Sequence, residues 1–199
     1  MSTAVPQNVG HGGDLAPSEW VGRCARLIAP GGRVLDLACG SGRHARLLRD
    51  LGHFVIAVDR DESALMHLKT ESHIETLCAD LESEAWPFPP DSFDALIVTN
   101  YLYRPLFAGI REALRIGGIL IYETFAAGNQ RYGRPSNPEF LLRRNELLSL
   151  VAPLQVLAFE QGIIQSPKTA VIQRICAVNA AQFDDLNSPI PVAGPGALR

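Results

Sequence analysis

Cysteine is scarce in this chain of 199 residues, and its four copies are scattered. They form no Cys-x-x-Cys pair, and no histidine stands at metal-ligand spacing from them, so we expect free thiols and no metal site. A strong charge of one sign is also lacking, because the formal net charge is only −3. This balance excludes a general attraction to nucleic acid or to an anionic membrane.

Long apolar runs are absent as well. No stretch approaches the roughly 20 residues of a membrane-spanning helix. The first twenty residues lack the basic start and apolar segment of a secretory signal, so we expect a cytoplasmic protein. Hydrophobic residues make up 47% of the chain and charged residues 20%. These values are typical of a globular protein, and the length suits one domain with a sizeable core.

The most informative stretch runs from Val34 to Ala45, VLDLACGSGRHA. A short apolar run that contains Asp36 is followed by a turn with Gly40 and Gly42, and then by an amphipathic helical pattern. Strand, glycine turn and helix in this order open the nucleotide-binding α/β folds, where backbone N–H groups approach the ligand closely. The sequence therefore predicts a ligand site at this turn. The alternative is a turn with a purely structural role.

Asp36 indicates which ligand fits. We expect its carboxylate to face the crevice four residues before Gly40, where the pyrophosphate of a dinucleotide would lie. A like-charge contact at ~4 Å costs about 4 kcal/mol at an effective dielectric near 20, and an opposite charge gains as much. The pocket therefore suits S-adenosylmethionine, which has a cationic end, an adenosine and no phosphate. The competing hypothesis is a nicotinamide-dependent oxidoreductase of Rossmann type, which shares this opening unit.

Two later strands also end in an acid. Residues 53–59 form a buried apolar run that ends in Asp59, and residues 74–80 form a strand that ends in Asp80. We expect the two oxygens of Asp59 to accept hydrogen bonds from both ribose hydroxyls. An alternative role for Asp59 is the N-cap of a helix that begins near Asp61. Three consecutive strands with an acid at the same end predict one adenosine site.

The segment from Val34 to Gly42 resembles the first motif of the class I S-adenosylmethionine-dependent methyltransferases, in which an acid precedes three alternating glycines. Ala38 stands at the first glycine position here. The resemblance implies that S-adenosyl-L-methionine is the cofactor and that Asp80 and Leu81 hold its adenine. The other residues expected to contact the cofactor come from the glycine turn and the strand ends: Asp36, Leu37, Ala38, Gly40, Gly42, His44, Asp59, Arg60 and Asn100.

The resemblance also implies the fold. We expect an α/β protein with a Rossmann-like, seven-stranded, mostly parallel sheet, an antiparallel closing hairpin and helices on both faces. The strands are expected at 34–37, 53–59, 74–80, 93–98, 119–125, 156–164 and 169–179, and the helices at 17–29, 45–51, 61–72, 106–115 and 140–150. Residues 17–180 form a single methyltransferase domain in this scheme, between a mobile segment 1–16 and a disordered tail 181–199.

Three segments most resemble the tellurite-resistance (TehB-like) methyltransferases: residues 100–105 (NYLYRP), 122–125 (YETF) and 140–147 (FLLRRNEL). Enzymes of this family that methylate bases or glutamine usually carry Asn or Asp, two prolines and an aromatic residue at this place. This chain has Asn100-Tyr101-Leu102-Tyr103 and no proline there. That departure argues against methylation of nucleic acid, and the resemblance implies a small-molecule acceptor.

The substrate side is expected in the loops after the fourth and fifth strands. Tyr101 and Tyr103 would line the methyl site, while the guanidinium groups of Arg104, Arg131 and Arg134 would bind an anionic or soft chalcogen acceptor. Solvated loop arginines are the alternative. Trp20, in the first helix, stands either beside the cofactor or in the core.

The sequence offers no convincing general base. His44 is expected near the cofactor rather than in the reaction, and Tyr101, Tyr103 and Glu123 are the only titratable side chains expected on the acceptor side of the sheet edge. A soft chalcogen nucleophile needs no base, whereas a hydroxyl does. The missing base also fits a non-catalytic, cofactor-binding subunit that is active only with a partner chain. The sequence does not predict the oligomeric state.

Overall fold

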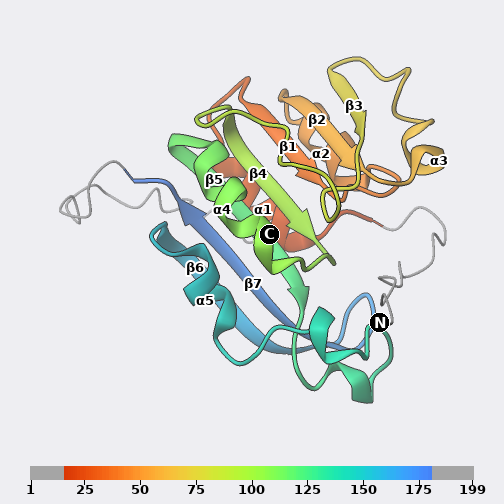
Figure 1. Cartoon of the computed structure of the whole chain (residues 1–199), viewed down its shortest axis with the longest axis vertical. Coiled ribbons are helices and arrows are strands. Elements are labelled where there is room, and N and C mark those ends of the chain that lie inside the picture. The colour runs from red at the N-terminus through yellow and green to blue at the C-terminus, as the bar shows by residue number, and fades with distance from the viewer. Residues whose placement is uncertain (1–15, 181–199) are drawn as a thin grey trace, which may run out of the picture.

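The computed structural model describes residues 16–180 of the chain, which form an α/β fold around one seven-stranded sheet (Figure 1). The strand order is β3-β2-β1-β4-β5-β7-β6, and β7 alone runs against the others. The strands are β1 (Arg33–Leu37), β2 (Phe54–Asp59), β3 (Ile74–Cys78), β4 (Phe93–Thr99), β5 (Leu114–Phe125), β6 (Gln155–Ile164) and β7 (Ala170–Val178). All seven predicted strands are present, and the predicted fold class is confirmed. The expected tail 181–199, and all but Ala16 of the expected segment 1–16, lie outside the described residues.

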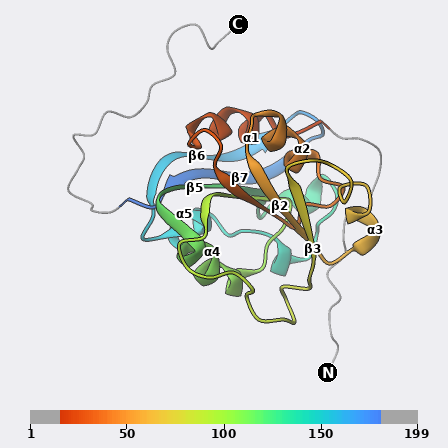
Figure 2. The same ribbon diagram turned by 90° about the horizontal axis from the view of Figure 1, so that it is seen from above.

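Helices cover both faces of this sheet (Figure 2). The α-helices are α1 (Glu19–Cys24), α2 (Arg43–Asp50), α3 (Glu62–Leu65), α4 (Phe107–Ala113) and α5 (Glu146–Val151), and the 3-10 turns are η1 (Ala25–Leu27), η2 (Arg104–Leu106), η3 (Asn129–Arg131) and η4 (Pro138–Phe140). One apolar cluster packs α1, α2 and α3 on one face, and a second packs α4 and α5 on the other. Within residues 16–180, no helix has the length and apolar character needed to cross a membrane.

The central strands are buried on both faces, as expected of parallel strands between helical layers. Leu35 of β1 pairs in register with Ile56 of β2 and with Leu96 of β4. Alternate β1 side chains point to opposite layers, so Leu35 and Leu37 pack on the α4 side, while Val34 packs on the α1 side. The carboxyl ends of β1, β2 and β4 therefore meet at one edge of the sheet.

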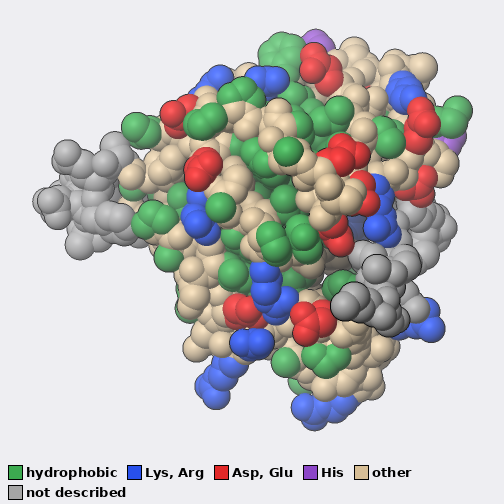
Figure 3. Space-filling model, viewed as in Figure 1, with side chains coloured by type: hydrophobic (Ala, Val, Ile, Leu, Met, Phe, Trp, Pro, Cys, Tyr) green, Lys and Arg blue, Asp and Glu red, His purple; other side chains and the backbone are tan. Residues whose placement is uncertain are grey.

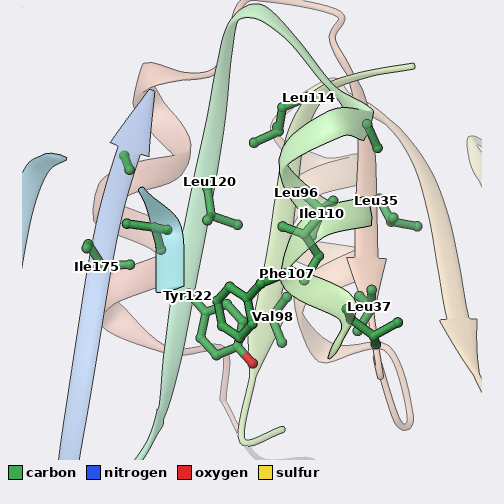
Figure 4. Packing of buried hydrophobic residues seen from close by; sticks show 14 of the residues in the cluster. Leu35, Leu37, Leu96, Val98, Phe107, Ile110, Leu114, Leu120, Tyr122 and Ile175 are labelled. Atoms are coloured by element: carbon green, nitrogen blue, oxygen red, sulfur yellow. The ribbon is translucent and has the colours of Figure 1, made fainter. Parts of the chain in front are cut away.

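Figure 4 shows the packing on the α4 side of the sheet. The ring of Tyr122 in β5 stacks on Phe107 of α4, with ring centroids 5.1 Å apart. The Tyr122 hydroxyl donates to the backbone carbonyl of Tyr101, at 2.8 Å. A buried core side chain thereby fixes the backbone of the loop that follows β4.

Two predicted helices are much shorter than expected. The helix expected over 61–72 is the single turn α3, although Leu65 and Leu68 face inward as predicted. The helix expected over 140–150 begins only at Glu146, after an N-cap Asn145 with a φ of 60°. The residues before it are extended because the Leu142 N–H donates to the carbonyl of Phe125 and the Ala127 N–H donates to the carbonyl of Leu142.

Two other helices also end earlier than expected. The helix expected over 17–29 gives way to a 3-10 turn after Cys24. The helix expected over 106–115 ends at Ala113, and β5 begins at once, since Leu114 pairs with Phe93 of β4. The pairing of Leu114 with β4 therefore ends the second of these helices before the next glycine.

Candidate cofactor and acceptor site

A cavity of about 910 Å³ opens at the carboxyl edge of the parallel strands. Its lining includes most of the residues predicted to contact the cofactor: Leu37, Ala38, Gly40, Asp59, Arg60, Asp80, Leu81 and Asn100. Asp36, Gly42 and His44 were predicted as cofactor contacts as well, but they do not line it. Of the three acids expected at the strand ends, Asp59 and Asp80 therefore line one space, and Asp36 does not.

The glycine turn after β1 has an unusual backbone. Ala38, Gly40 and Gly42 have φ values of 54°, 56° and 81°, which lie in the left-handed region. A Cβ added at Gly40 would meet nothing within 4 Å, whereas one at Gly42 would lie 2.4 Å from a methyl carbon of Leu68. Gly40 thus keeps space open at the cavity, and Gly42 lets the turn pack against the core.

Asp59, at the end of β2, holds this turn in place. Its Oδ2 accepts the Gly40 N–H at 2.8 Å, and its Oδ1 accepts the Asp61 N–H at 3.0 Å. The N-cap of α3 is Asp61 itself, so the alternative role of Asp59 as that cap is wrong. Each oxygen of Asp59 has a second lone pair, and the side chain lines the cavity, so it can also accept hydrogen bonds from a ligand.

Asp36 does not face the crevice, contrary to expectation. Its neighbours Leu35 and Leu37 point to the α4 side, and the Asp36 carboxylate is buried beneath the turn. Burial raises its pKa to about 7, although Arg43 and the Ala45 N–H favour the charged form. Oδ2 accepts no hydrogen bond from residues 16–180. A cationic ligand above the turn would favour ionisation of this carboxyl.

His44 connects the first helix to the sheet. The backbone N–H of Ser18 donates to its Nε2 at 3.0 Å, and its Nδ1 lies 3.2 Å from Oγ1 of Thr99. Because Nε2 accepts, the proton belongs on Nδ1, where it points to Thr99. Burial, followed by the nearby charge of Arg43, lowers the pKa of His44 to about 3. His44 is therefore a neutral connector behind the cavity wall.

The predicted substrate-side residues are less well placed. Tyr101 lines the cavity, and burial raises the pKa of its hydroxyl. Tyr103 does not line it, because its hydroxyl donates to the carbonyl of Glu82 at 3.3 Å. Arg104 was expected to receive the acceptor, but it is engaged with α5 and is not part of the lining. Arg131 and Arg134 also lie outside the lining, on the exposed loop after β5.

Other charged residues take their place. Arg43, Lys168 and Arg174 line the cavity together with the predicted Glu123. Oε1 of Glu123 accepts the hydroxyl of Ser18 at 2.9 Å, and its Oε2 pairs with Arg174 at 3.3 Å. Sequence reasoning missed the three cations because no local motif marks them. Lys168 and Arg174 belong to the hairpin of β6 and β7, and only the pairing of that hairpin with the sheet brings them to this edge.

Trp20 belongs to the core and not to the cavity. Its ring is almost fully buried, and its Nε1–H donates to the carbonyl of Ile175 at 3.3 Å. The guanidinium groups of Arg23 and Arg174 lie over the ring, at 4.6 and 4.9 Å from its centroid. The core alternative for Trp20 is therefore correct.

On the face seen in Figure 3, acidic and basic side chains are interspersed. The described residues of this face form no extended patch of one sign.

Residues 34–118 match the family model of a methyltransferase domain. A demethylmenaquinone methyltransferase from Corynebacterium urealyticum is 36% identical over 107 residues, which are 50% of this chain and 44% of the relative. A malonyl-[acyl-carrier protein] O-methyltransferase from Erwinia pyrifoliae is 34% identical over 104 residues, 49% of this chain and 38% of the relative. The chain spans less than half the length of these curated relatives.

Solved structures of similar shape include TehB from Haemophilus influenzae, with a TM-score of 0.67 and 21% identity over 79% of this chain and 60% of that one. A methyltransferase from Methanosarcina mazei also has a TM-score of 0.67, with 15% identity over 84% of this chain and 100% of that one. At these identities the likeness concerns the fold alone. Together with the family match, it confirms the class I methyltransferase resemblance seen in the sequence.

Proposed function

We propose that residues 17–180 are a class I S-adenosylmethionine-dependent methyltransferase domain that transfers a methyl group from this cofactor to a small molecule. The observation that carries the proposal is the convergence of the glycine turn, Asp59 and Asp80 on one cavity. The described geometry supports a ligand with an adenosine at this end.

The residues present fit S-adenosyl-L-methionine. Asp59 would accept the ribose hydroxyls, and Asp80 with Leu81 would hold the adenine. The open backbone at Gly40 would border the methionine part, with the buried Asp36 carboxylate beneath the turn as a counter-charge. When bound, the cofactor supplies an electrophilic methyl group on a sulfonium, whose leaving sulfur keeps the bonding electron pair.

This chain's own contribution to the reaction is placement. Alignment of the nucleophile with the methyl group contributes up to about 7–11 kcal/mol in well-oriented cases. Tyr101, fixed through its carbonyl by Tyr122, borders the cavity next to Asn100. Glu123 is already engaged by Ser18 and Arg174. An acceptor that arrives as an anion or a soft chalcogen therefore suits this site, because it needs no base.

Calorimetry with the full chain tests the cofactor half of the proposal. We expect S-adenosylmethionine and its demethylated product S-adenosylhomocysteine to bind, and NAD to bind at least 100-fold more weakly. Asp59→Ala should weaken the binding about 10- to 100-fold, since each hydrogen bond to a charged group contributes about 1.5–3 kcal/mol. The control Asp50→Ala removes an exposed acid at the far end of α2 and should leave the affinity unchanged.

The same experiment separates the competing functions. Tight binding of NAD without binding of S-adenosylmethionine would reject the methyltransferase proposal and support an oxidoreductase. Binding of the cofactor without methylation of any acceptor by the purified chain, restored by a cell extract, would indicate a subunit that needs a partner.

A further inference from the structure

The cavity has a second arm, away from the acids of β2 and β3. The strand order places β1 and β4 between those acids and β5, and then β7 and β6 follow. This arm is lined by Phe125 at the end of β5, Phe140, Ile164 at the end of β6, and Ala170 and Ile172 of β7. The adenosine end is marked by carboxylates, whereas this arm is mainly apolar.

Four of the five residues of this apolar lining, all but Phe140, belong to one small cluster that also contains Leu141. Phe125, Leu141, Ala170 and Ile172 pack together, with Ile164 at their edge. They belong to neither of the two large clusters that hold the helices on the sheet. This cluster provides an apolar surface at the cavity, and a ligand that covers it would remove that surface from water.

One cation stands at this arm. The Nζ of Lys168, in the turn between β6 and β7, lies 5.7 Å from the centroid of the Phe125 ring. No carboxylate among residues 16–180 forms an ion pair with it. The nearby Arg174, in contrast, is paired with Glu123 and Glu160. Lys168 is therefore the cation of this arm that can take the charge of a ligand.

We infer that the methyl acceptor is an amphipathic organic anion, with an apolar ring or chain against Phe125 and Ile172 and an anionic group at Lys168. This inference rests on the proposed function and narrows its acceptor class. A small inorganic oxyanion would leave the apolar surface uncovered, and it needs several donors at once. The three arginines predicted to supply those donors lie outside the lining. Of the arginines in it, Arg174 is paired with Glu123 and Glu160, and Arg43 donates to the carbonyl of Ala16.

Binding to the chain saturated with S-adenosylhomocysteine tests the inference. The probes are octanoate, octan-1-ol and selenite, which offer an apolar chain with a charge, the same chain without one, and an inorganic oxyanion. Octanoate should bind at least tenfold more tightly than either of the others. Lys168→Gln should abolish the preference for octanoate over octanol, and the control Lys69→Gln, an exposed lysine paired with Glu62, should keep it.

Equal binding of octanoate and octanol, tighter binding of selenite, or an unchanged preference in Lys168→Gln would each overturn the inference. Ile164→Ser provides a second variant at a half-buried position. It should weaken octanoate and octanol alike by severalfold and leave selenite unaffected. Affinity for S-adenosylhomocysteine is measured first in every variant, so failure of the proposed function appears as loss of that binding and is distinct from failure of the acceptor assignment.

Discussion

Arg104 and Glu146 form a two-point ion pair that joins the turn after β4 to the first turn of α5. Nε lies 2.8 Å from Oε1, and Nη2 lies 3.0 Å from Oε2. The same guanidinium donates to the carbonyls of Glu139 and Leu141. Its donors are thus used within the fold, which is why it is not available to an acceptor.

Arg104→Ala should therefore lower stability and not substrate affinity. We expect a loss of about 1–2 kcal/mol in the free energy of unfolding, because several hydrogen bonds are lost at a half-buried site. Urea denaturation measures the loss, and a cycle with Glu146→Ala should show a coupling of at least about 0.5 kcal/mol. An unchanged stability together with a tenfold higher KM for the acceptor would show that Arg104 binds the acceptor, as the sequence predicted.

Asp36 gives the protein a pH dependence with an unusual sign. Its pKa rises from an ordinary 3.8 to about 7 in the folded chain. Between these values the folded state keeps a proton that the unfolded state has lost, so stability falls as pH rises from about 4 to 7. A shift of this size corresponds to at most about 4 kcal/mol. Urea unfolding should give a lower free energy of unfolding at pH 8 than at pH 5 in the wild type, and a smaller difference in Asp36→Asn. An equal difference in the two proteins would contradict this.

The glycines of the turn should have separable roles. Gly40→Ala is expected to cost only about 1–2 kcal/mol of backbone strain but to reduce cofactor affinity at least tenfold, since its methyl group enters open space at the cavity. Gly42→Ala should cost about 2–4 kcal/mol of stability, because its Cβ collides with Leu68. Gly52→Ala is the control, with a φ of 90° and no atom within 4 Å. Gly52→Ala should lose stability through backbone strain and keep its cofactor affinity. A loss of cofactor affinity similar to that of Gly40→Ala would show that strain, and not the position of Gly40 at the cavity, causes the effect.

His44 should stay neutral over the whole range in which the protein is folded. With its pKa lowered to about 3 by burial, the imidazole carries its proton on Nδ1 at pH 5 to 8. Nitrogen NMR of the histidine side chains measures this tautomer directly, and His44→Gln identifies the signal. A His44 signal that titrates near pH 6.5, or that shows the proton on Nε2, would contradict the described connection to Ser18.

The strands and the acidic end of the cavity could be predicted because their signals are local. The apolar run before Asp59, and the glycines after Asp36, determine a buried strand and a turn within a dozen residues of sequence. The sequence also placed Asp59 and Asp80 correctly at the cavity edge, since parallel strands end on the same side. Side chains alternate between the two faces of a strand, so Asp36 points to the face opposite to Leu35 and Leu37 and not into the cavity. The prediction from its charge did not take this alternation into account.

The acceptor half could not be predicted, because its residues are brought together by distant contacts. Arg104 pairs with Glu146, 42 residues later in the chain, and no local pattern encodes that pair. The helix expected from Phe140 is replaced by pairing of Leu142 with the end of β5. Lys168 reaches the cavity only because β7 inserts between β5 and β6. No period or motif in the sequence encodes these placements.

Because β7 lies between β5 and β6, the two sides of the cavity come from different parts of the chain. The stretch that matches the methyltransferase family model, 34–118, contains the glycine turn and the carboxylates of Asp59 and Asp80, and it stops within β5. The terminal hairpin, which carries Lys168 and Ile172, comes later and touches the cavity from the opposite side. Under the proposed function, exchange of that hairpin alone is therefore expected to redirect the domain to a different acceptor and to leave its handling of the methyl donor intact.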